Sequence, residues 1–163
     1  MSRVLSANDN PPTPRAMLLQ KDFPDHHDAE IVLRLYEMRR EPVMRESRGT
    51  LVRTFLPASV EDMLAVVKGD HPMNAAYRQV TSYWEMAYGM VRHGVLHADF
   101  MLDSNGEGLV LYARVAPYVE EFRKQANSPR AFRNAEWVAT QTDAGRQLFA
   151  HFTERAKRQQ AKK

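Results

Sequence analysis

The sequence predicts an all-α domain, a single bundle of about six or seven helices with a flexible N-terminal arm and a basic C-terminal tail. Apolar residues recur every three to four positions along most of the chain, and the period-two alternation typical of a strand is not seen. Prolines and capping residues precede these segments. With 163 residues, 44% of them hydrophobic, the chain is long enough to form one domain with its own core.

Three segments are expected along the chain. Residues 1–24, rich in proline and asparagine, form a disordered or extended arm, residues 25–155 form the helical domain, and residues 156–163 belong to a basic tail. The last nine residues carry five of the 23 basic groups, which leaves 18 basic against 20 acidic groups in the body. The net charge of +3 therefore comes mostly from the C-terminal end.

The first two helices are expected to meet at a proline. The first begins at a capping Asp25 or Asp28 and continues through Arg40, with apolar residues on one face. Pro42 then stands at the first turn of a second helix, a position that proline favours because its missing N–H has no intrahelical partner there. This second helix runs toward Pro57.

The clearest prediction is a helix over residues 72–93, between Pro72 and Gly94. It follows a shorter helix that starts at Ser59, whose hydroxyl suits an N-cap. One apolar stripe of the long helix has a 3.6-residue period and consists of Met73, Ala76, Tyr77, Val80, Trp84, Ala87 and Val91. A second apolar strip is formed by Tyr83, Met86 and Met90. A helix with two apolar sides belongs in the middle of a bundle.

The C-terminal half is expected to contain three more helices. Residues 94–108 predict a loop or short turn, and a helix over 108–126 should be kinked at Pro117, which lacks a backbone donor. The Ser-Pro pair at 128–129 favours the start of another helix, and the Thr-Asp pair at 142–143 favours the start of the last one.

Composition excludes several classes of protein. The chain has no cysteine, so disulfide scaffolds and thiol catalysis are excluded. Its longest mostly apolar run, from Leu109 to Val119, contains Arg114 and Pro117 and is far shorter than the ~20 residues of a membrane-spanning helix. No secretory signal is seen at the start, so we expect a cytoplasmic location.

Motifs for catalysis or metal binding are incomplete. His93 and His97 are four residues apart, but Gly94 interrupts the helix between them, and the His27–Asp28 doublet lacks the further ligands of a metal-dependent phosphohydrolase. The chain contains no Glu-x-x-His motif and no Gly-x-Ser-x-Gly motif. We therefore expect no catalytic residue, metal or cofactor, and an enzyme is disfavoured.

Two sets of residues are candidates for binding. The aromatic set, Tyr77, Trp84, Tyr88 and Tyr112, could line a ligand pocket, although a core or subunit interface would use the same residues. The second set suits an interface between helices and consists of Arg39, Arg40, Met44, Arg45 and Arg48.

The second set lies in a recognisable block. Residues 35–48 read Leu-Tyr-Glu-Met-Arg-Arg-Glu-Pro-Val-Met-Arg-Glu-Ser-Arg and are similar to the LYxxRREPxMRxxR block of a family of small, uncharacterised bacterial helical proteins. The resemblance is strong over this block and looser up to about Val138. It implies a helical bacterial domain and transfers no catalytic residue. The block also predicts Arg–Glu pairing across the joint at Glu41 and Pro42.

These observations favour a non-enzymatic interaction or scaffold protein that associates with itself or docks on a protein partner. Nine methionines and the arginines on helical faces suit adaptable interfaces between helices. The first alternative is a small-molecule sensor or enzyme with the aromatic pocket. The second is weak binding of a polyanion or nucleic acid through the Arg block and the tail, which we regard as unlikely because the body of the protein is not basic.

Overall fold

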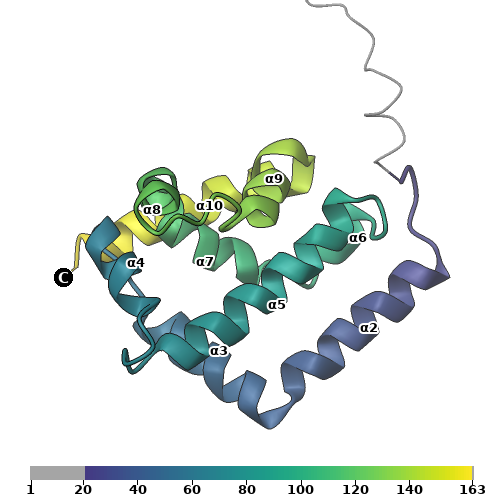
Figure 1. Ribbon diagram of the computed structural model, residues 1–163. Coiled ribbons are helices and arrows are strands. Elements are labelled where there is room, and N and C mark those ends of the chain that lie inside the picture. Colours follow the sequence, from purple (N-terminus) through teal and green to yellow (C-terminus); the bar gives the residue numbers. More distant parts are fainter. Residues whose placement is uncertain (1–20, 163) are drawn as a thin grey trace, which may run out of the picture.

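The centre of the fold is α5 (Asn74–Arg92), the helix with the clearest apolar stripe. Figure 1 shows α5 crossing the molecule between two groups of helices, with α2 and α3 below it and α8, α9 and α10 above it. The computed structural model describes residues 21–162, so residues 1–20 of the expected arm and the last residue of the tail lie outside the described residues. The all-α fold class is confirmed, because the described residues form helices and no strand.

The elements follow one another with short connections. In chain order the other helices are α2 (His26–Arg40), α3 (Pro42–Thr54), α4 (Val60–Val66), α6 (Ala98–Leu102), α7 (Glu107–Val115), the 3-10 helix η1 (Ala116–Tyr118), α8 (Val119–Gln125), α9 (Arg133–Gln141) and α10 (Asp143–Gln160). No helix in this described part of the chain is both long and apolar enough to cross a membrane.

Most helix starts follow the predicted capping signals. Asp25 caps α2 by accepting from the backbone N–H groups of His27 and Asp28, and Pro42 occupies the first turn of α3. Ser59 accepts from the backbone of α4, and Thr142 accepts from Gly145 N–H at 3.0 Å at the start of α10. Residues next to each helix start, three polar caps and one proline, therefore set where these four helices begin.

The differences from the sequence-based expectation lie in the second half. The expected helix over 108–126 is divided, because Pro117 ends α7 in the 3-10 helix before α8 begins. The segment expected as a loop contains α6, and α9 begins at Arg133 rather than near residue 129. α10 also continues through residues 156–160, which were expected to belong to the tail. The described residues therefore contain more helices than expected.

Buried Arg114 joins three helices without a carboxylate partner. It is 4% exposed, and its Nη1 donates to the carbonyls of Val52 and Phe55 at the end of α3, at 2.8 and 3.2 Å. Its Nη2 donates to Gln159 in α10. Because the last carbonyls of a helix carry partial negative charge, they stabilise a cation at this position. Burial lowers the pKa of Arg114 relative to an ordinary arginine.

Helices α5 and α7 approach closely at one glycine. The Tyr88 side chain of α5 is completely buried, and its hydroxyl donates to the Asn105 carbonyl at 3.0 Å and accepts from Leu109 N–H at 3.1 Å. A Cβ at Gly108 would lie 2.6 Å from the Tyr88 ring and 2.8 Å from the Trp84 ring. These contacts are too short, so glycine is required where α7 begins.

We expect Gly108→Ala to destabilise the protein by about 1–3 kcal/mol, because the added methyl group must displace two buried aromatic rings. The free energy of unfolding in urea measures this effect. Gly69→Ala is the matched control, because a Cβ there would meet no atom within 4 Å. Equal stability of the two variants would contradict the proposed packing of α5 against α7.

Candidate functional site

The exposed face of α5 has an uncharged seam. Ala75, Gln79, Ser82 and Met86 are all exposed and are spaced four, three and four residues apart, so they lie along one side of the helix. None carries a charge, although 26% of the residues in the chain do. Surfaces that dock on other proteins are depleted of charged residues at their centre, and this seam has that property.

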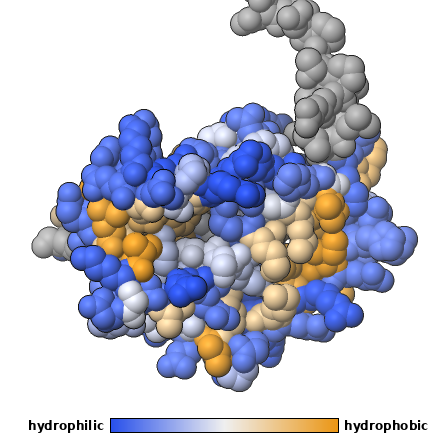
Figure 2. All heavy atoms as spheres, in the orientation of Figure 1, coloured by the Kyte–Doolittle hydropathy of each residue, from blue (hydrophilic) through white to orange (hydrophobic). Residues whose placement is uncertain are grey.

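A methionine groove runs along one side of this seam. Its lining includes Met38 from α2, Met44 from α3 and Met86 from α5, and its volume is about 430 Å³. Met38 and Met86 are 47% and 43% exposed, whereas Met44 is 3% exposed. Figure 2 shows apolar atoms gathered on the part of this face where α2 and the second half of α5 lie. Flexible methionine side chains can adapt to an apolar surface placed against them.

The five interface candidates of the Arg block differ in burial and in their contacts. Met44 is buried, so it contributes to the groove and the core rather than to an exposed patch. Arg40 donates to the Tyr36 hydroxyl at 2.8 Å, and the Arg39 guanidinium lies over the rings of Tyr36 and Trp84. Arg45 is exposed.

The expected Arg–Glu pairing across the joint is wrong for the described residues. Arg48 instead pairs with Glu107 at the start of α7, through two hydrogen bonds of 2.7 and 2.6 Å. This interaction with Glu107 raises the pKa of Arg48. The Glu41 side chain accepts from Met44 N–H and caps α3. A local helix cap and a contact distant in sequence therefore replace the pairing that the spacing suggested.

The aromatic candidates are packed as a core. Tyr77, Trp84, Tyr88 and Tyr112 are between 0% and 6% exposed, and the cavity beside Trp84 has a volume of only about 10 Å³. Their neighbour Tyr83 donates to the Leu35 carbonyl of α2 at 2.8 Å, and burial raises the pKa of Tyr83 to about 12. Of the four candidates, Tyr77 lies at the edge of a larger groove on the other side of the seam, where it lines a wall together with Phe132.

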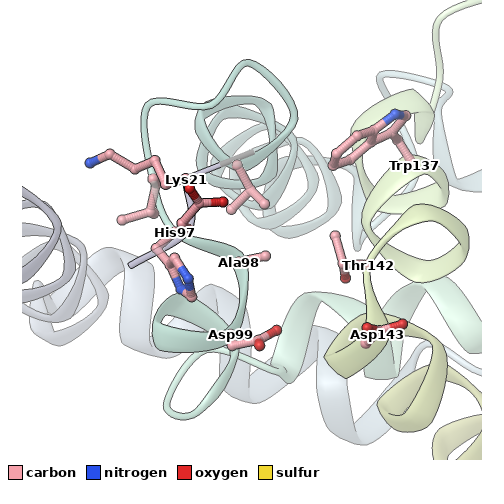
Figure 3. Close-up of a pocket in the computed structure, with 10 residues that line it drawn as sticks. Lys21, His97, Ala98, Asp99, Trp137, Thr142 and Asp143 are labelled. Atoms are coloured by element: carbon pink, nitrogen blue, oxygen red, sulfur yellow. The ribbon is translucent and has the colours of Figure 1, made fainter. Parts of the chain in front are cut away.

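A polar pocket lies at the C-terminal end of α5. It has a volume of about 260 Å³ and is lined by residues from the end of α5, the start of α6 and the junction of α9 with α10. Figure 3 shows Asp99 and Asp143 below the opening, Trp137 and Thr142 on one side, and His97 on the other. The side-chain amine of Lys21 is directed away from the opening. This arrangement combines carboxylates with one aromatic wall.

Buried Asp28 holds the His97 side of this pocket in place. It is 0% exposed, its Oδ1 accepts from His97 N–H at 2.8 Å, and its Oδ2 accepts from Asp25 N–H at 2.7 Å and from Lys21 Nζ at 3.0 Å. Burial alone would raise the pKa of Asp28, but these hydrogen bonds and the Lys21 charge outweigh it, so the pKa lies below the ordinary value. His97 in turn caps α6, because its Nδ1 accepts from Phe100 N–H.

Sequence reasoning placed Asp28 at a helix start but missed its contact with His97, which lies 69 residues further along the chain. It also missed that Met38 lines the methionine groove and that α5 has an exposed uncharged seam. The missing charges at positions 75, 79, 82 and 86 were a signal that could have revealed the seam. In the described residues, no group of three or more His, Asp or Glu side chains is arranged to hold a metal ion.

Comparison with protein families gives one match. The model of a domain of unknown function, DUF4760, matches residues 24–142, which contain α2 to α9. The chain belongs to this family. The expectation of a family without an assigned activity is thereby confirmed. Neither the search of curated proteins nor the search of solved structures gives a match. The DUF4760 match includes the seam, the methionine groove and Asp28, whereas the whole of α10 lies beyond it.

We expect Asp28→Asn to destabilise the DUF4760 domain by about 2–4 kcal/mol at neutral pH, because the amide cannot accept every hydrogen bond of the buried carboxylate. A carboxyl group whose pKa is lowered in the folded state stabilises the fold at pH values above its ordinary pKa. This stabilisation is lost as the pH falls toward the pKa of the folded state. The difference between wild type and variant should therefore shrink below pH 3.8, the ordinary aspartate value.

Urea unfolding between neutral and acid pH checks this expectation. Asp22→Asn is the matched control, because Asp22 is exposed and makes no hydrogen bond within residues 21–162. A stability difference for Asp28→Asn that stays constant across this pH range would contradict the role of the ionised carboxylate.

Proposed function

We propose that this DUF4760 domain is a protein-interaction domain that pairs with a second copy of itself through the outer face of α5. The observation that carries the proposal is the uncharged seam of Ala75, Gln79, Ser82 and Met86 beside the methionine groove. Ordinary exposed helix faces carry charged residues, whereas these four residues carry none and the charge of exposed Arg78 lies beside them. A cytoplasmic, bacterial setting is part of the proposal and rests on the sequence alone.

The spacing along the seam supports a helical partner. Residues four, three and four apart follow the repeat by which two helices pack side by side over several turns. The small side chains of Ala75 and Ser82 allow a second backbone to approach, and Met86 can fill irregular space between the helices. A helix docked here would also cover part of the methionine groove, which Met86 lines.

The absence of charge on the seam supports a second copy as that partner. In a two-fold pair the same surface lies on both sides, so any charged group near the axis would face its own copy. The exposed residues of the seam contain no such group. A charged partner helix would find no group of opposite charge on the seam. An identical uncharged helix would meet no repulsion there.

We expect light scattering over a concentration series to show a dimer of the full chain, and Met86→Glu to raise its dissociation constant by about tenfold or more. The reason is that the dimer would bury a carboxylate on the seam with no cation beside it. Met86 is 43% exposed in the single chain, so the variant should fold and should have an unchanged unfolding midpoint at concentrations where both proteins are monomeric.

Val95→Glu is the matched control. Val95 is 51% exposed and apolar, but it lies in the turn after α5 and away from the seam, so this variant should dimerise like wild type. The proposal is wrong if the wild-type chain stays monomeric at every concentration, or if Met86→Glu and Val95→Glu associate equally well. Association only with a different added protein would assign the seam to that protein instead.

A further inference from the structure

A second groove lies on the other side of the α5 seam. It has a volume of about 380 Å³ and lies between α5, Val67 after α4, and the connection from α8 to α9. Arg78 of α5 and Arg130 of the connection both line it, so we call it the arginine-lined groove. Its volume falls within the range of about 300–1,000 Å³ that is typical of small-molecule sites.

The two arginines of this groove are not used by the fold. Both are exposed, and within residues 21–162 neither guanidinium makes a hydrogen bond or an ion pair. By contrast, Arg48 and Arg123 are each paired with a glutamate. Arg78 and Arg130 therefore present unneutralised positive charge and free N–H donors at one groove.

The acidic residue of the same groove has other partners. Glu85 accepts from Asn134 N–H at 3.0 Å and from Ala135 N–H at 2.8 Å, one bond to each carboxylate oxygen. It thereby caps the first turn of α9, where Phe132 provides no side-chain cap. The bonds of Glu85 go to the backbone of α9, and no hydrogen bond or ion pair within residues 21–162 joins it to Arg78 or Arg130, so both arginines are available for an anion from outside.

Aromatic rings form the apolar part of the groove. Tyr77, Phe122 and Phe132 line it and are all buried. Phe132 has a left-handed backbone conformation, with φ of 56°, which is costly for a bulky residue. Glu85 accepts hydrogen bonds from Asn134 and Ala135, which closely follow Phe132, and these bonds help to hold the backbone of Phe132 in this conformation. The conformation keeps the Phe132 ring in the groove wall.

We propose that the arginine-lined groove binds a small carboxylate with an apolar body. The carboxylate would bind Arg78 and Arg130, and the body would cover the edges of Tyr77, Phe122 and Phe132 that remain exposed in the groove wall. An inorganic anion would leave this apolar wall in water, and a neutral apolar molecule would leave both guanidinium groups without partners. Ser82 of the seam also lines this groove, so the site adjoins the proposed pairing surface, although neither arginine belongs to the seam.

Calorimetric titration of the full chain with octanoate tests the proposal. Octanoate combines a carboxylate with an apolar body, acetate has only the carboxylate, and octanol has only the body. We expect octanoate to bind at least about tenfold more tightly than either, and Arg78→Gln and Arg130→Gln each to weaken octanoate binding by about tenfold. Octanol should bind the variants and wild type equally.

Arg53→Gln is the matched control, because Arg53 is an exposed arginine outside the groove, and it should leave octanoate binding unchanged. Unfolding midpoints and light-scattering masses recorded in the same solutions show whether a variant has lost its fold or its pairing. Equal binding of octanoate and octanol, binding that survives both glutamine variants, or binding only of an acidic peptide would overturn the proposal. A monomeric wild type that still binds octanoate through these arginines would refute only the pairing.

Discussion

One fully buried hydroxyl of α5 joins this helix to the start of α7. Tyr88 donates to the backbone before α7 and accepts from the backbone inside it, so its polar group is satisfied only while α5 and α7 stay in register. Gly108 makes this approach possible. Since α9 and α10 pack on α5 and α7, a shift at this point would move the walls of both grooves.

Polar side chains of α5 and its neighbours also determine how the outer helices are placed. Tyr83 bonds to the α2 backbone, Glu85 caps α9, and Arg114 of α7 closes the end of α3. The contacts of Glu85 and Arg114 satisfy backbone groups that a helix end would otherwise leave without partners. Tyr83, Glu85 and Arg114 therefore have structural partners, whereas the guanidinium groups of Arg78 and Arg130 at the surface have none within residues 21–162.

Local signals in the sequence account for most of the fold. The N-caps at Asp25 and Ser59 and the break at Pro117 act within a few residues, so their consequences can be predicted without tertiary information. The start of α9 could not be predicted in this way. Its cap comes from Glu85, which lies 49 residues earlier in the chain, and the Ser-Pro signal at 128–129 precedes a turn instead.

The candidate sites were harder to predict for the same physical reason. An aromatic residue such as Trp84 or Tyr88 has the same spacing whether it faces a ligand or the core, and only packing decides between them. The grooves are formed by helices that meet across long stretches of sequence, as Met38 and Met86 do. The uncharged seam is different, because its spacing and its lack of charge on a single helix can be read from the sequence, although its exposure cannot. Absence of charge at regularly spaced positions is therefore a signal that a sequence can supply for a proposed binding face.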